Sequence, residues 1–289
     1  MRYPARLVRI LLILACGFQA GACGARCCKA LRTSFGYLQV DRRDVPAATK
    51  AGNAISRSAR DILEISDVQI LIVDKRHTKY RWGDSTPSGL PVYPWSFAHG
   101  TVDLRKNPPD DILPHEIGHD LFRRYVVPET VAGEYGTAAP DWLDESVAVA
   151  FEAPEQKAGR RCEASRLSTS GALFPVHRFL TMAHPDSAAA PAPQAAGDAR
   201  AFVRSTSVSQ DTPAFYAMSI AFPEYLVART GSTAILAELA RASRTGVSLE
   251  SRILSRVAGA GRQFDPEELN RDFLLWLASD KRYQCLGAN

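Results

Sequence analysis

The sequence predicts an α+β protein with a small mixed sheet near the N-terminus and helices over most of the remainder. The first observation is a β-branched run, Val68–Val73, whose composition is typical of a buried strand. The second is a series of apolar residues at helical spacing that begins at Pro213 and continues towards the C-terminus. The third is a helix-forming segment between these regions that carries His115 and His119, four residues apart.

Length and composition allow one large domain or two small ones. The chain has 289 residues, of which 46% are apolar, and can therefore bury a sizeable core. We expect a signal peptide at residues 1–22, a mature N-terminal segment at residues 23–43 and the main domain at residues 44–289. Residues 184–211 are rich in Ala, Pro and Ser, which predicts a long mobile loop inside this domain.

The first 22 residues have the pattern of an export signal. Arg2, Arg6 and Arg9 are positive, Leu7–Ala15 is mostly apolar, and Ala20–Ala22 offers a small-x-small cleavage site. The apolar run is too short to span a bilayer as a helix. Removing this segment lowers the net charge from +4 to +1, because it holds three Arg and no acid. The remaining charge shows no basic patch that would predict binding to nucleic acid.

The Cys residues predict an oxidising compartment, periplasmic or extracellular. Cleavage after Ala22 makes Cys23 the first mature residue, and an N-terminal Cys is the residue that is lipidated in bacterial lipoproteins. The residues before Cys23 match the lipobox motif of such proteins only weakly. The exported protein is therefore expected to be either free or lipid-anchored at Cys23. Lipidation would leave four Cys for disulfides, an even number. We expect Cys162 and Cys285 to be disulfide-bonded, either with each other or with Cys27 and Cys28.

The N-terminal part of the main domain is predicted to contain a helix, three strands and a loop. Apolar residues at helical spacing predict a helix over Asp44–Ser66, followed by the buried strand Val68–Val73. The charged stretch Lys75–Arg81 predicts a second, exposed strand. Five Gly and Pro residues make Gly83–Pro94 a loop, and Ala98–Leu104 predicts a further short strand.

The pattern H-E-x-x-H at residues 115–119 is the strongest functional signal. On a helix, His115 and His119 lie on one face, one turn apart, and can bind the same metal ion. Glu116 follows the first His and can reach a water on that metal, as in zinc hydrolases. Pro114 lacks an N–H, so the helix should begin close to Asp111 or kink at Pro114; Pro128 should end it.

A second motif follows in a short predicted helix, Pro140–Glu152, which contains Trp142-Leu143-Asp144-Glu145. H-E-x-x-H followed by W-L-x-E-x-x-A resembles the gluzincin zinc metallopeptidases, in particular the bacterial peptidase-MA-like branch. This resemblance implies a zincin-like fold and makes Glu145 the third zinc ligand. The family motif usually has Asn where this chain has Asp144 and Gly where it has Ser146, and neither departure removes a ligand.

The C-terminal part is predicted to be helical after a looser polar stretch, Glu155–Arg166, and a short apolar element, Phe174–Leu180. Pro213–Arg229 predicts a helix, kinked at Pro223 and ended by Gly231. Apolar spacing predicts three further helices, at residues 233–242, at residues 249–257 and from residue 266 onward. Each is preceded by a residue that can cap it, namely Ser232, Ser248 and Asp265 in that order. Tyr216, Ser219, Phe222, Tyr225 and Leu226 resemble a helical pattern of the same family.

The resemblance implies a zinc-dependent metallopeptidase that acts on a peptide or protein substrate. One zinc per chain would be bound by His115, His119 and Glu145, with Glu116 as general base. Related gluzincins use a downstream Tyr to stabilise the oxyanion, which makes Tyr216 the candidate here. Asp144 is a candidate acceptor for a ligand His N–H.

Other interpretations stay open at this point. His77 and His99 are expected at the surface, although the strand that carries His99 lines the cleft in gluzincin-like folds. His177 and His184 are weak alternative ligands because no spacing supports them. A non-catalytic exported lipoprotein that keeps a gluzincin fold for binding, or a zinc hydrolase of a non-peptide bond, would share the same motifs.

Overall fold

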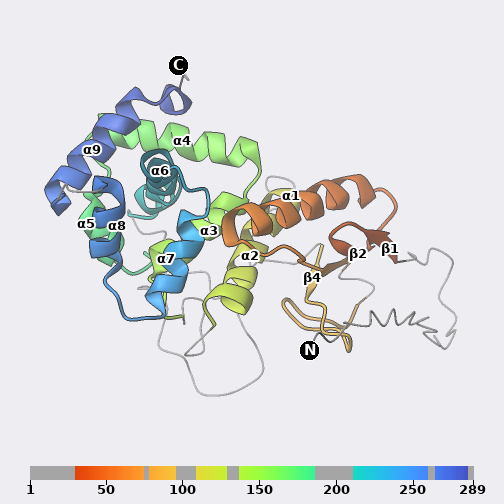
Figure 1. Ribbon diagram of the computed structural model, residues 1–289. Helices are drawn as coiled ribbons and strands as arrows, with labels where there is room; N and C mark the ends of the chain where they lie inside the picture. The colour runs from red at the N-terminus through yellow and green to blue at the C-terminus, as the bar shows by residue number, and fades with distance from the viewer. Residues whose placement is uncertain are drawn as a thin grey trace, which may run out of the picture.

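The computed structural model describes residues 30–74, 78–95, 109–128, 137–185, 211–259 and 264–285. The predicted signal peptide, Cys23, Cys27, Cys28, His77, His99, the strand at residues 98–104 and residues 186–210 of the predicted loop lie outside these ranges. A small sheet and α1 (Val45–Leu63) occupy one side of the molecule, and the later helices occupy the other (Figure 1). Helices α2 (Pro109–Leu121) and α3 (Asp141–Phe151) lie between them. The predicted α+β class is therefore confirmed.

The sheet has four short strands in the order β1-β2-β3-β4. Their bounds are Leu31–Thr33, Gly36–Gln39, Ile70–Val73 and Val92–Pro94. The first pair is antiparallel and the other two pairs are parallel, so the predicted mixed sheet is confirmed.

Only β3 among these strands was predicted from the sequence. Strands β1 and β2 precede residue 44, where no strand was expected, and β4 lies in the predicted loop Gly83–Pro94. The expected strand over Lys75–Arg81 is wrong for residues 78–81, which form no strand. Strands β1, β2 and β4 have three or four residues and are too short to show a clear alternation of apolar and polar residues, so they could not be predicted from the local pattern.

Helix α1 connects β2 to the parallel strand β3 and covers the sheet. Its apolar face repeats every three or four residues and is fully packed. This face comprises Ala48, Ala51, Ile55, Ala59 and Leu63. A Cβ atom on Gly52 would lie 2.2 Å from the ring of Phe35, so Gly at this position lets the helix approach the β1–β2 turn. The predicted helix in this region is confirmed.

Helix α2 begins earlier than expected. It starts at Pro109, so Pro114 lies inside the helix and not in its first turn. A π-helical turn, Phe122–Val126, extends it before Pro128, where the sequence predicted its end. The centre of α2 packs closely on α3, because a Cβ atom on Gly118 would lie 2.9 Å from the Cα atom of Ala148.

Helix α3 is buried on almost every side, including its polar residues Asp144, Glu145 and Ser146. It confirms the predicted helix over Pro140–Glu152, of which the first and last residues are the caps. A helix buried on all sides is an internal element that neighbouring helices must surround. Here α2 covers one side and α6 (Thr212–Thr230) another.

The stretch after Glu152 is a helix and not the looser segment predicted from its polar residues. Helix α4 spans Pro154–Thr169 and buries only Ala164 and Leu167, so it has little apolar periodicity to detect. Polar contacts to other elements hold it in place instead.

The short apolar element at Phe174–Leu180 forms helix α5 (Val176–Thr181), which was not predicted to be a helix. The four later helices agree with prediction within a few residues. They are α6, α7 (Ile235–Ser243), α8 (Leu249–Ala258) and α9 (Pro266–Ser279). Gly231 ends α6 in the left-handed conformation with φ of 68°, as expected for a C-cap. Ser248 and Asp265 cap α8 and α9 through their side chains, as predicted. The predicted cap Ser232 is wrong: α7 begins after Ala234, and the Ser232 hydroxyl donates to the side chain of Glu238 in that helix instead of accepting a bond from a backbone N–H.

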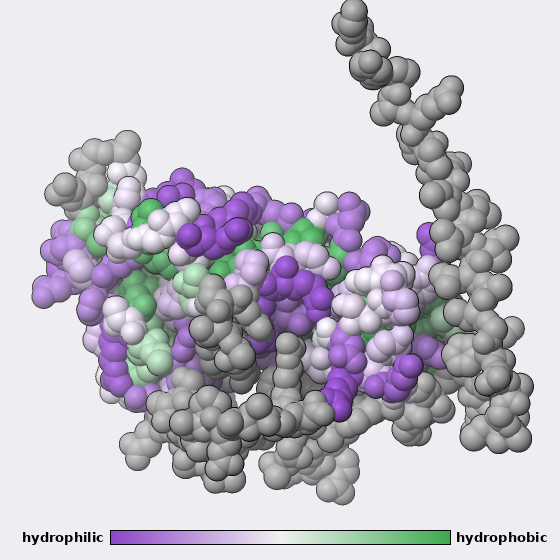
Figure 2. Space-filling view, turned by 90° about the horizontal axis from the view of Figure 1, so that it is seen from below, coloured by the Kyte–Doolittle hydropathy of each residue, from purple (hydrophilic) through white to green (hydrophobic). Residues whose placement is uncertain are grey.

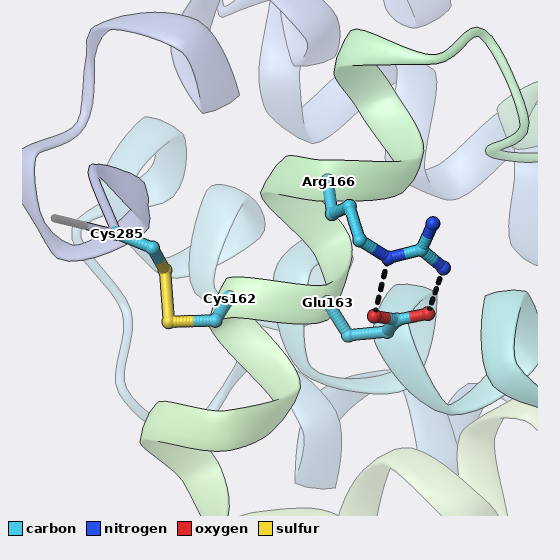
Figure 3. Close-up of a disulfide and its surroundings, with 4 residues drawn as sticks. All are labelled: Cys162, Glu163, Arg166 and Cys285. Atoms are coloured by element: carbon cyan, nitrogen blue, oxygen red, sulfur yellow. Dashed lines mark hydrogen bonds and ion pairs between the residues drawn. A yellow bond between two sulfur atoms is a disulfide. The ribbon is translucent and has the colours of Figure 1, made fainter. Parts of the chain in front are cut away.

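A disulfide between Cys162 and Cys285 joins α4 to the C-terminal segment across a sequence separation of 123 (Figure 3). This confirms that both Cys are oxidised and selects one of the predicted pairings. The neighbouring residue Arg161 pairs with Glu224 of α6 at 2.6 Å, and the Tyr283 hydroxyl donates to the same carboxylate at 2.8 Å. Covalent and polar contacts therefore fix α4 to α6 and to the C-terminus together.

On the face seen in Figure 2, hydrophobic areas alternate with hydrophilic ones over the described part of the chain. The large exposed apolar side chains come from several different elements. They are Leu31, Tyr37, Tyr125, Val247 and Leu275. Within the described ranges, no helix combines the length and the apolar character that crossing a membrane requires.

The contact at Gly118 predicts the effect of a single methyl group. Gly118→Ala should lower the free energy of unfolding by about 1–3 kcal/mol, because the added carbon meets backbone that cannot rotate away. Gly159→Ala is the matched control: it lies inside α4 with nothing within 4 Å of an added Cβ, and should raise stability by about 0.5–1 kcal/mol. Urea unfolding of both variants measures the difference, and equal shifts would contradict the close packing of α2 on α3.

Candidate metal centre

His115 and His119 point from one face of α2 towards Glu145 on α3. Their rings lie 5.0 Å apart, centroid to centroid. The Nε2 atom of His115 is 3.4 Å from Oε1 of Glu145, and the Nε2 atom of His119 is 3.5 Å from Oε2. The structure thus brings together the three side chains that were predicted as ligands, in a group that can hold a metal ion.

Each imidazole also lies within hydrogen-bonding distance of a carboxylate other than Glu145, through its Nδ1 atom. Nδ1 of His119 is 2.7 Å from Oδ1 of Asp144, and Nδ1 of His115 is 2.8 Å from Oε1 of Glu152. A carboxylate at Nδ1 keeps the proton on that nitrogen and leaves Nε2 to act as the ligand atom. The expected contact of Asp144 with a ligand His is confirmed.

Glu152 is a functional residue that the sequence reasoning missed. It follows Glu145 by seven residues, which is two helical turns, and this spacing was the available signal. Both oxygens of Glu152 accept N–H bonds from the Arg160 guanidinium of α4, the Nε bond measuring 2.6 Å. Burial opposes ionisation of Glu152, but the bonds from His115 and Arg160 outweigh it and lower its pKa.

The centre is buried and rich in negative charge. The exposed fraction is 0% for Glu145 and 2% for His119. Burial disfavours the charged imidazolium of His119, but the charge and hydrogen bond of Asp144 outweigh burial and, with Glu145, raise its pKa to about 10. The pKa of His115 is also raised: burial opposes the shift, and Glu145 and Glu152 cause it. The carboxylates therefore favour a positive charge between the two rings, which a metal ion would supply in place of protons.

The spacing of the three donor groups fits a zinc ion. Zinc prefers tetrahedral ligands at about 2.0–2.1 Å, and two such ligands lie roughly 3.3–3.4 Å from each other. The two distances from Nε2 to a Glu145 oxygen, 3.4 Å and 3.5 Å, are close to this value and longer than a charge-assisted hydrogen bond. The other described group of possible ligands, Asp41, Asp44 and Asp74, consists of carboxylates alone and lacks the imidazoles that zinc favours.

Glu116 lies beside this centre without belonging to the ligand group. Its side chain is half-buried, and its charge contributes to the raised pKa of both His115 and His119. It therefore occupies the neighbourhood of the donor atoms, where a base for an attacking water is needed.

Tyr216 of α6 lies on the same side of the site as His115. Its ring centroid is 6.4 Å from that of His115, and the Arg160 guanidinium stacks on it at 4.3 Å. Arg160 thus contacts both the carboxylate that holds His115 and the ring of Tyr216. The structure brings the predicted oxyanion donor to the site, through a packing interaction that the sequence did not predict.

His184 is a further residue that the structure brings to the centre. Its Nε2 atom is 3.7 Å from Oε2 of Glu145, and its backbone N–H donates to Asp141 at 2.7 Å. Its buried ring packs edge-on against Phe215 at 4.8 Å. It lies outside the group of mutually close ligand atoms, so it contacts a ligand without joining the set. His177, in contrast, is exposed on α5 and pairs with Glu250.

Metal analysis tests the ligand assignment. The parent protein should bind about one zinc per chain, and Asp144→Asn should weaken zinc affinity about 10- to 100-fold because it loses the charge that orients His119. His119→Ala should weaken it further, since a donor atom is removed. His177→Ala is the matched control, because this His lies outside the group, and it should bind zinc like the parent. Full zinc content in His119→Ala would rule out this ligand set.

Comparisons with known proteins supply no family for this chain. The sequence matches no protein-family model, and searches of curated proteins and of solved structures also find no match. The assignment of the site therefore depends on the geometry of α2, α3 and the residues that surround them.

Proposed function

We propose that the protein is a zinc-dependent hydrolase that cleaves peptide bonds, with a gluzincin-like active site. The observation that carries the proposal is the arrangement of His115, His119 and Glu145: two imidazoles, each held at Nδ1 by a carboxylate, face a third carboxylate through Nε2. Three protein ligands of this kind are typical of catalytic zinc, since they leave a position for water and substrate. A purely structural zinc site would normally have four protein ligands.

The residues around the ligands support hydrolysis. A zinc ion bound there would polarise the substrate carbonyl and acidify an attacking water. The Glu116 carboxylate would accept the proton of that water and return it to the leaving amine. A protein that only binds a partner would have no need for a base at this position, so Glu116 favours an enzyme over a binding protein.

Tyr216 is the proposed second stabiliser of the oxyanion. Its hydroxyl would donate a hydrogen bond to the carbonyl oxygen as negative charge develops there. Stacking of Arg160 on the ring restricts the orientation of Tyr216, and the bonds from Arg160 to Glu152 fix the guanidinium itself. The donor would therefore be held in place before the substrate arrives, which is the condition for effective electrostatic catalysis.

Export to an oxidising compartment is part of the same proposal. The disulfide between Cys162 and Cys285 supports it, because such bonds persist in secreted and periplasmic proteins. Mass spectrometry of the protein from its native host should find an N-terminus at or near Cys23, with a diacylglycerol mass if the protein is lipid-anchored. An intact Met1 terminus in a cytosolic fraction would contradict export.

Glu116→Gln tests catalysis separately from metal binding. The variant keeps the shape of the side chain but cannot accept a proton, so peptide hydrolysis should fall about 10²- to 10⁴-fold with zinc content and melting temperature unchanged. Glu145→Gln should instead lose zinc, because it weakens a ligand. The measurement is zinc content and cleavage of an unbiased peptide library by both variants. Undiminished cleavage by Glu116→Gln would refute the mechanism, and a zinc-loaded parent that cleaves no peptide would favour a binding protein or a non-peptide hydrolase.

Tyr216→Phe tests the oxyanion donor. Loss of the hydroxyl should lower kcat about 10²- to 10³-fold while zinc affinity stays the same, because the group would act only on the developing charge. Tyr37→Phe removes a hydroxyl from a tyrosine on β2 and is the control. Steady-state kinetics on one cleaved peptide would decide, and equal kcat values for the two variants would assign Tyr216 a packing role.

A further inference from the structure

A cavity of about 300 Å³ lies between α1 and the corner where α3 passes into α4. One wall comes from a single face of α1, which carries Lys50, Arg57 and Asp61. The opposite wall comes from residues 150–154 and from Lys157 of α4. Pro114 and Glu152 also line it, so the cavity lies behind the residues that hold His115 and not above the ligand atoms.

Three cations line this cavity with few opposite charges to balance them. Lys50 and Arg57 lie two turns apart on α1 and form no ion pair or hydrogen bond within the described part of the chain. Lys157 donates from Nζ to the carbonyl oxygen of Ala150 at 3.1 Å, which leaves its other N–H groups for a further acceptor. Burial and the nearby Arg161 lower the pKa of Lys157, and this effect outweighs the opposite influence of Glu224 and Glu152.

The two acids in the lining do not neutralise these cations. Glu152 is already bonded to Arg160 and His115. Asp61 is exposed and receives an N–H bond from Arg60, its neighbour in sequence, at 3.4 Å. The lining therefore keeps an excess of positive charge that a bound anion would balance.

We infer that this cavity binds a small oxyanion, a carboxylate or phosphate group carried on a compact apolar body. Lys50 and Arg57 of α1 and Lys157 of α4 line it and would donate charge-assisted hydrogen bonds to the oxygens. The apolar body would rest on Ala54, Ile62 and Phe151, which line the same cavity. The ligand would be distinct from a substrate at the metal centre, and the inference holds whether or not the protein is a peptidase.

Titration of the zinc-loaded protein with inorganic phosphate, acetate and phenyl phosphate tests the inference. Phosphate or acetate should bind saturably at one site per chain. The anion with the lower Kd shows whether the cavity prefers a phosphate or a carboxylate group. Phenyl phosphate should bind more tightly than inorganic phosphate because its ring reaches the apolar wall. Equal affinities for phenyl phosphate and inorganic phosphate would contradict the inferred contact of an apolar body with the cavity wall. The absence of saturable binding by all three probes would overturn the whole inference.

A double variant, Lys50→Gln with Arg57→Gln, locates the binding site. Both side chains are exposed, so the fold should persist, and affinity should fall about tenfold or more as two charge-assisted contacts are lost. Arg252→Gln removes an exposed cation of α8 outside the cavity and should bind the probes like the parent. Unchanged affinity in the double variant would place the anion elsewhere, for example on the zinc, and would refute the inference.

Acylation of Lys157 gives a second, local measurement that needs no variant. Its lowered pKa should make the amine reactive towards acetic anhydride, and a bound oxyanion should protect it. Mass spectrometry of the Lys157 peptide, with and without saturating phenyl phosphate, should show at least about a threefold loss of labelling, as expected when a charge-assisted hydrogen bond occupies the amine. Equal labelling in the two samples would show that no anion contacts Lys157.

Discussion

The candidate active site depends on how closely α2 packs against α3. Gly118 makes this possible, since any larger residue there would meet the backbone of Ala148. The contact lies between the two turns of α2 that carry His115 and His119, one helical turn or less from each. It sets the distance from both imidazoles to Glu145, and a shift of α2 would open both Nε2 contacts at once. One small residue thus allows α2 to lie close enough to α3 for His115, His119 and Glu145 to form a group that can hold a metal ion.

Helix α4 connects the site to the rest of the protein through three consecutive residues. Arg160 bonds to Glu152 and stacks on Tyr216, Arg161 pairs with Glu224 of α6, and Cys162 forms the disulfide with the C-terminal segment. Because α4 buries few apolar groups, these contacts carry much of its attachment. The orientation of His115 therefore depends, through Glu152 and Arg160, on contacts made far from the metal centre.

The carboxylates around the imidazoles need positive charge nearby. Asp144, Glu145 and Glu152 are almost fully buried, and buried carboxylates need a compensating positive charge. A metal ion would supply it at Nε2, and Arg160 supplies it at Glu152. The cations of the cavity behind Glu152 have no such partner, which is why an external anion is the expected complement there.

The sequence by itself identified His115 and His119 as a pair on one helical face, because H-E-x-x-H is a property of a single helix, whose period is local; Glu145 was identified as their partner only through the family resemblance of the second motif. The local helical period also predicted α1, α3 and the capped helices α8 and α9. Only the tertiary structure decided the short strands β1, β2 and β4, the polar helix α4, and the arrival of Glu152, Arg160 and His184 at the site. These features arise from contacts between elements that are distant in sequence, and no local periodicity encodes which side chain will meet which carboxylate.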